Sequence, residues 1–215
     1  MPSVGRRLPL VALAAVLGVL AGLGIRAAAD QDAATAEHAG AVNAFASWRF
    51  HFDTSAEMLA TADLVVEGDV TSVGRGRIIA GNSTTRQQLK EYRMQVTRTW
   101  KGSAAAGPLT VEGAGWEISS VPGEGEMELV FAETIEPAPG DHAIVYLTRN
   151  NGDGRLSYIN NQGVFIVKDG QVEDSSRTDP MVAAMERRSA VTLRQRLQAD
   201  LRLVAAGAVT AKPAP

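Results

Sequence analysis

The stretch D-L-V-V-E-G-D-V-T-S-V, residues 63–73, decides the fold class of this chain. Its apolar residues at positions 64, 66 and 70 fall on one face of an extended chain, and its polar residues at positions 67, 69 and 71 fall on the other. This alternation predicts a half-buried β-strand, because successive side chains of a strand point to opposite sides. Gly68, in the middle, indicates a bend or bulge of the kind that a small barrel needs.

The chain that follows repeats this pattern between turn residues. A second long strand is expected over 92–100, and a hairpin with its loop is expected over 74–89. Shorter strands are expected over 109–112, 128–132, 142–148, 156–159 and 164–167, with tight turns at 150–154 and 169–170. The segment 142–148 is apolar on both faces and should lie in the middle of the fold. These short strands predict a mainly β fold, a small antiparallel OB-like barrel or sandwich, and exclude a parallel α/β sheet.

Helix signals flank the strands on both sides. Thr54-Ser55-Ala56-Glu57 has the spacing of a capping box, so a short helix is expected over 55–61. Asp179-Pro180 predicts the start of a C-terminal amphipathic helix that runs to about residue 206. Its apolar stripe predicts packing on the barrel, whereas its five arginines favour a partner or a membrane surface: Arg187, Arg188, Arg194, Arg196 and Arg202.

The first 29 residues have the three parts of an export signal. Two arginines come first, residues 8–25 are apolar, and Ala27-Ala28-Ala29 supplies the small residues of a cleavage site. The apolar stretch is also just long enough to cross a bilayer as an N-terminal apolar helix. Cleavage after Ala29 would give a secreted protein, and retention would leave an anchor in the cytoplasmic membrane with the rest of the chain facing outward.

Together these segments predict five parts. They are a signal peptide or N-terminal membrane anchor (1–29), a linker (30–53), a β-barrel-like domain (54–175), a C-terminal helix (179–206) and a frayed tail (207–215).

The composition excludes several chemistries. The chain has 215 residues, no cysteine and three histidines, so it has no disulfide framework, thiol nucleophile or zinc ribbon. The net charge of −3 does not favour nucleic acid as a partner. No cofactor is predicted, and Ca²⁺ held weakly by carboxylates is the only metal that the residues suggest.

An acidic stretch runs through the middle of the chain. From Gly102 to Thr148 there is no lysine or arginine, while eight acidic residues occur. This stretch is either a solvated acidic surface or, with its aromatic residues, a patch for a basic partner or Ca²⁺. The candidate patch residues are Trp100, Trp116, Glu117, Glu124, Glu126, Glu128 and Phe131.

The residues of one strand leave a catalytic alternative open. Glu67 and Asp69 share one strand face, where they could act on one substrate, although that face is more simply the solvent side. A serine paired with His142 is the other possible hydrolase site. Neither forms a recognisable motif, so the leading hypothesis is a non-catalytic exported or membrane-anchored envelope module that binds a protein or another surface ligand.

Five runs resemble a recurring module of exported bacterial proteins. They are A-D-L-V-V-E-G-D-V (62–70), Y-R-M-Q-V-T-R-T-W-K-G (92–102), L-T-V-E-G (109–113), P-G-D-H-A-I-V-Y-L-T (139–148) and N-N-Q-G-V-F-I-V-K-D-G (160–170). The module is similar to the OB-like barrel of netrin and tissue-inhibitor-of-metalloproteinase domains. The resemblance implies an OB-like fold, an exported location and, as one subclass, a peptidase-inhibitor-like function. This chain lacks the cysteines, including the N-terminal one, with which those inhibitors act.

Overall fold

The structure, a computed structural model, describes residues 26–27, 41–45, 50–80, 84–121, 123–131, 135–150, 152–173 and 179–213. The predicted apolar helix over 8–25 and the predicted cleavage site after Ala29 lie outside these residues. Within the described ranges, no helix combines the length and the apolar character needed to cross a membrane.

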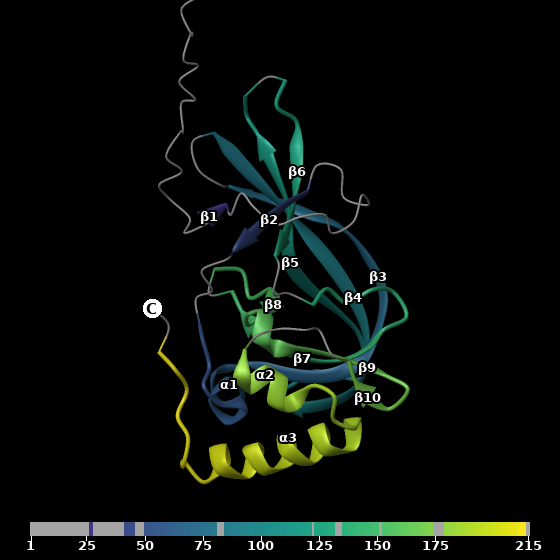
Figure 1. The fold of residues 1–215 in the computed structure, drawn as a ribbon, viewed down its shortest axis with the longest axis vertical. Coiled ribbons are helices and arrows are strands. Elements are labelled where there is room, and N and C mark those ends of the chain that lie inside the picture. The colour runs from purple at the N-terminus through teal and green to yellow at the C-terminus, as the bar shows by residue number, and fades with distance from the viewer. Residues whose placement is uncertain are drawn as a thin grey trace, which may run out of the picture.

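Strands dominate the molecule, which confirms the prediction of a mainly β fold (Figure 1). The strands are β1 (Arg26–Ala27), β2 (Ala41–Phe45), β3 (Leu64–Ala80), β4 (Thr85–Lys101), β5 (Gly107–Ser119), β6 (Glu126–Phe131), β7 (His142–Arg149), β8 (Leu156–Tyr158), β9 (Val164–Lys168) and β10 (Gln171–Val172). The helices are α1 (Ser55–Thr61), the 3-10 turn η1 (Asn161–Gly163), α2 (Pro180–Met185) and α3 (Ala190–Ala205).

The central strands form a sheet that curls back on itself. β3 pairs antiparallel with β4 on one side and with β7 on the other, and β4 pairs antiparallel with β5. β8 then connects the two ends, because it pairs with β7 and makes one parallel bridge to β5, between Glu112 and Ser157. β6 and β2 add to the far end of β5, away from α3 (Figure 1).

The expectation of a hairpin and loop over 74–89 was wrong in extent. β3 continues to Ala80 and β4 begins at Thr85, so most of this range belongs to two paired strands. Gly76 lies where the register shifts between Arg75 and Ile78, and a Cβ there would come within 3.1 Å of the Leu89 carbonyl oxygen. The glycine therefore accommodates a close strand crossing at a bulge and does not end the strand.

Two hydrophobic cores lie on opposite faces of β3 and β7. Val66 and Val145 belong to the core inside the curled sheet, and Val65 and Tyr146 belong to the core outside it, under the helices. The central position predicted for residues 142–148 is thus confirmed. Leu193 and Leu197 of α3 are buried in the outer core, so this helix packs on the sheet.

Two helices occupy the range in which a single C-terminal helix was expected. Arg187 has a positive φ of 57°, which no α-helix contains, and the Ser189 side chain caps the start of α3. The backbone of Val172 in β10 bonds to both Arg187 and Arg188. The connection is therefore held against the sheet edge, which sets α2 and α3 at an angle to each other (Figure 1).

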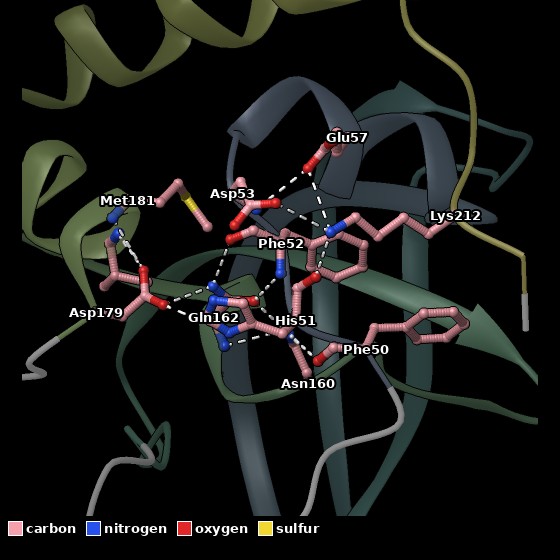
Figure 2. A network of polar contacts seen from close by, with 11 residues as sticks. Phe50, His51, Phe52, Asp53, Glu57, Asn160, Gln162, Asp179, Met181 and Lys212 are labelled. Atoms are coloured by element: carbon pink, nitrogen blue, oxygen red, sulfur yellow. Dashed lines mark hydrogen bonds and ion pairs between the residues drawn. The ribbon is translucent and has the colours of Figure 1, made fainter. Parts of the chain in front are cut away.

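Residues 50–53, expected in the linker, and the C-terminal tail are both fixed to the core (Figure 2). Phe50 and Phe52 are buried, and the buried amides of Asn160 and Gln162 hold their backbone. Gln162 Oε1 accepts from the Phe52 amide at 2.8 Å, and its Nε2 donates to the Phe52 carbonyl at 2.9 Å. Lys212 in the tail donates to the His51 carbonyl at 2.7 Å, so the two ends of the described domain meet beside α1.

The predicted helix over 55–61 is confirmed as α1. Thr54 accepts from the Glu57 amide at 3.2 Å, and Glu57 accepts from the Asp53 amide at 3.1 Å. The carboxylate thus bonds one residue earlier than in the standard capping box. At the other end, the Lys101 ammonium group donates to three backbone carbonyls, those of Leu59, Ala60 and Ala62.

Candidate functional site

The residues of the predicted hydrolase alternative do come together. His142 of β7 lies between two carboxylates of β3: its Nε2 is 3.0 Å from Glu67 and its Nδ1 is 2.6 Å from Asp69. Arg194 of α3 donates to the same Glu67 oxygen from Nε at 3.0 Å, and Trp100 donates to the other oxygen at 3.1 Å. The expectation that this strand face meets solvent was wrong for Glu67. Helix α3 covers the Glu67 side chain, of which only 5% is exposed.

These contacts favour the charged forms of Glu67 and His142. Burial disfavours the charged carboxylate of Glu67, but hydrogen bonds from Arg194 and His142 outweigh it and lower the pKa of Glu67 below its usual value. Burial likewise opposes the charge of His142, and its bonds to Glu67 and Asp69 outweigh that effect and raise the pKa of His142. The cluster is an ion network that joins α3 to the sheet.

This arrangement is poorly suited to hydrolysis. A catalytic histidine needs one free ring nitrogen to accept a proton from a serine. Both ring nitrogens of His142 face carboxylates, and in the described ranges no serine hydroxyl is bonded to it. Glu67 already accepts from three side chains, which leaves it little capacity to act as a base.

The predicted aromatic and acidic patch is divided between two places. Trp116 lies opposite Glu128 across β5 and β6, and Glu117 and Glu126 lie on the same two strands. Trp100 lies elsewhere. Trp116 pairs with Gln88 of β4, and Trp100 follows Gln88 by twelve residues, which is roughly 40 Å along the strand. Of the other two, Glu124 bonds to Ser119 in the turn before β6, and Phe131 ends β6, with its side chain outside the described part.

Cations of the same chain neutralise much of the acidic stretch. Arg75 forms an ion pair with Glu126, and its guanidinium lies over the Trp116 ring, 4.5 Å from the ring centre. Lys90, nearly buried, lies between Glu128 at 2.8 Å and Glu136 at 2.5 Å. Among the described residues, no group of three or more histidine or acidic side chains is placed to hold a metal ion.

A cavity on the sheet is the best candidate for a ligand site. It has a volume of about 510 Å³, within the range of small-molecule pockets. β3, β4, β5, β8 and β9 line it, together with Ile135 and with Asn150 and Arg155 between β7 and β8. Most of its lining is apolar, and it includes Ile79, Leu89, Tyr92, Ala114, Tyr158 and Val164.

Two tyrosines form the floor of this cavity, which we name the sheet pocket. The rings of Tyr92 and Tyr158 meet edge to face with their centres 5.3 Å apart. Gly113 makes room for them, because a Cβ there would lie 2.8 Å from the Tyr92 ring. Burial raises the pKa of both hydroxyls, so both stay protonated. The Tyr158 hydroxyl is buried without a hydrogen-bond partner in the part of the chain that the structure describes.

The charged side chains at the rim of the sheet pocket are paired with one another. Glu112, nearly buried, accepts two hydrogen bonds from Arg77, at 2.8 and 2.9 Å, and a third from Arg155 at 3.0 Å. Asp153 lies 2.7 Å from Arg77. Glu136, which also lines the pocket, pairs with Lys90. The rim therefore gives the pocket polar edges with little net charge.

Local sequence patterns do not reveal this pocket. Its residues come from five strands and from segments between strands, and no short-range pattern in the sequence joins them. The one local signal was Gly113 beside Glu112, a glycine inside a strand, which marks a close approach of other groups. Comparisons with protein-family models, curated proteins and solved structures gave no significant match.

Proposed function

We propose that this chain is a non-catalytic ligand-binding module of the cell envelope, whose ligand, a surface molecule or a side chain of a partner protein, enters the sheet pocket. The observation that carries the proposal is the pocket itself, with a volume of about 510 Å³ and a mostly apolar lining. The ordered tyrosine floor supports it, because such a pocket needs little rearrangement when it receives an apolar group.

An OB-like barrel is the fold that this proposal assumes. In an OB fold, five strands close in the order one, two, three, five, four, with the third and fifth strands parallel. β3, β4, β5, β7 and β8, taken as strands one to five, follow that order, and the bridge between β5 and β8 is parallel. OB folds bind ligands on strands two and three and on the loops at their edges. The sheet pocket lies on β4, on β5 and beside Asn150 and Arg155, although a fold alone does not determine function.

The location of the module follows from the first 29 residues. We propose export by these residues, followed either by cleavage after Ala29 or by retention of residues 8–25 as an anchor. N-terminal sequencing of the protein from cell fractions tests this: Asp30 as first residue in a soluble external fraction indicates cleavage, and an intact leader in the membrane fraction indicates anchoring. Full-length protein in the cytosol would contradict export.

Binding is tested with a library of small neutral aromatic and aliphatic compounds, observed through the amide NMR signals of the protein. We expect saturable shifts centred on Gly113, Ser157 and Tyr158. Ala114→Phe places a ring in the pocket and should abolish them. Ala184→Phe adds the same volume on α2, which contributes no lining residue to the sheet pocket, and serves as the matched control. Shifts that are absent, or that survive Ala114→Phe, would disprove the pocket as the binding site.

A second candidate, an exported hydrolase, is favoured only by the approach of Glu67, Asp69 and His142. The purified protein should be assayed with ester, peptide and glycoside substrates. Turnover that Glu67→Gln or His142→Ala removes, in variants that remain folded, would support this candidate over the non-catalytic one. Turnover that neither substitution changes would exclude it.

A further inference from the structure

A second cavity lies between the start of α1 and the two C-terminal helices. Its volume is about 470 Å³, and it shares no lining residue with the sheet pocket. We propose that this cavity, the helix pocket, binds a small anionic amphiphile, a single molecule with an apolar body and a carboxylate head such as a medium-chain fatty acid. The proposal does not depend on the function of the sheet pocket.

The walls of the helix pocket suit an apolar body. Pro180, Met181, Ala184 and Met185 come from α2, and Leu193 comes from α3. Leu193 and Met185 are buried members of the outer core, so the floor is ordered. Methionine side chains are unbranched and polarisable and adapt to irregular apolar surfaces. A purely hydrophilic anion such as inorganic phosphate would leave this lining without a matching partner.

Two arginines at the edge of the helix pocket suit an acidic head. Arg188 and Arg196 both line the pocket and both are exposed. In the described part of the chain each is held through Nε alone, Arg188 by the Ala184 carbonyl at 3.4 Å and Arg196 by Ser55 at 3.2 Å and by Asp200. These bonds orient the two guanidinium groups and leave their terminal nitrogens for a ligand. Guanidinium forks bind carboxylates with two parallel hydrogen bonds.

The remaining charges near the helix pocket do not cancel this preference. Asp53 is the only acidic side chain that lines it within the described residues, and Lys212 lies 3.4 Å from that carboxylate. Asp200 is buried, and Arg196 and Ser55 cover it. Arg188 therefore has no acidic partner among the described residues, and its charge separates an acidic amphiphile from a neutral one of the same length.

Calorimetric titration with decanoate below its micelle concentration tests the proposal. We expect saturable binding to the full chain, weakened at least tenfold by Arg188→Gln and lost in Ala184→Phe. Ala114→Phe, which fills the sheet pocket, should bind decanoate as the parent does. Decanol should bind at least tenfold more weakly than decanoate, and inorganic phosphate should not bind.

Three outcomes would overturn the proposal. Equal binding of decanoate and decanol would show that the arginines do not recognise the head. Decanoate binding that survives Ala184→Phe but is lost in Ala114→Phe would place the ligand in the sheet pocket. Binding to phosphatidylglycerol vesicles that Ala184→Phe removes, without binding of free decanoate, would identify a membrane surface as the partner. Thermal unfolding of each variant establishes that it is folded before the titrations are compared.

Discussion

Removal of Arg194 should destabilise the protein, because it leaves the buried Glu67 carboxylate without its strongest partner. Arg194 donates twice to one oxygen of Glu67, at 3.0 Å from Nε and at 2.5 Å from one terminal nitrogen. Breaking a buried ion pair by removing one partner costs about 3–5 kcal/mol. The side chain of Arg194 is 32% exposed, so water can solvate part of the Glu67 carboxylate once the arginine is removed. For Arg194→Met we therefore expect the free energy of unfolding to fall by about 2–3 kcal/mol.

A double-mutant cycle with Glu67→Gln separates the ion pair from other effects of the substitution. Glutamine keeps an acceptor for Trp100 and has no charge that the loss of Arg194 could leave unpaired. The free energy of unfolding of the double variant should therefore exceed the value expected from adding the two single losses, by about 1–2 kcal/mol. Urea unfolding at pH 7, followed by tryptophan fluorescence, measures all four proteins. Arg202→Met, an exposed change on the same helix, is the control and should stay within about 0.5 kcal/mol of the parent.

The reasoning would be refuted if Arg194→Met were as stable as Arg202→Met, or if the two single losses were simply additive. Either result would mean that Glu67 does not depend on α3 for its charge. The carboxylate would then be free to act in other ways, and the hydrolase candidate would gain support.

Three other perturbations have defined outcomes. The pKa of His142 is raised, so its contribution to stability is full below about pH 6.5 and is lost as the pH rises through the higher pKa of the folded state. Urea unfolding from pH 6 to 9 should show this fall in stability, and His142→Gln should remove the pH dependence. Gly113→Ala places a methyl group 2.8 Å from the Tyr92 ring, so thermal unfolding should show a loss of about 1–3 kcal/mol, together with changed NMR signals around the sheet pocket. Lys101→Met removes three hydrogen bonds of 2.6–2.8 Å to the end of α1, and urea unfolding should show a loss of about 2 kcal/mol. An unchanged unfolding midpoint would show that water replaces the ammonium group without cost.

Local chemistry predicted the elements whose causes are local. The helix over 55–61 follows from a hydroxyl and a carboxylate three residues apart, and both make hydrogen bonds at the start of α1. The central place of residues 142–148 follows from apolar side chains on both faces of one segment. In both cases the information lies within a few residues of the element that it determines.

The parts that sequence reasoning missed depend on contacts between distant segments. Glycines near Gly76 indicated a loop, but the partner strand β4 extends β3 through that region and places the glycine at a bulge. Glu67 was expected on the solvent side, because nothing in residues 63–73 shows that α3 will cover it. The sheet pocket needs Tyr158 beside Tyr92, a contact that exists only after β8 closes the sheet. Such contacts have no short-range signal in a single sequence.

The distribution of charge is what distinguishes the two cavities. A stretch of 47 residues without lysine or arginine is consistent with either a solvated acidic surface or a binding patch. In the fold, cations of β3 and β4 meet that stretch from across the sheet, and Arg77 and Lys90 pair with Glu112 and Glu136 at the rim of the sheet pocket. At the helix pocket, Arg196 is paired with Asp200, whereas Arg188 bonds only to a carbonyl in the described part of the chain. We therefore expect the sheet pocket to select ligands by shape and apolar character, and the helix pocket to select them by the charge of the head group.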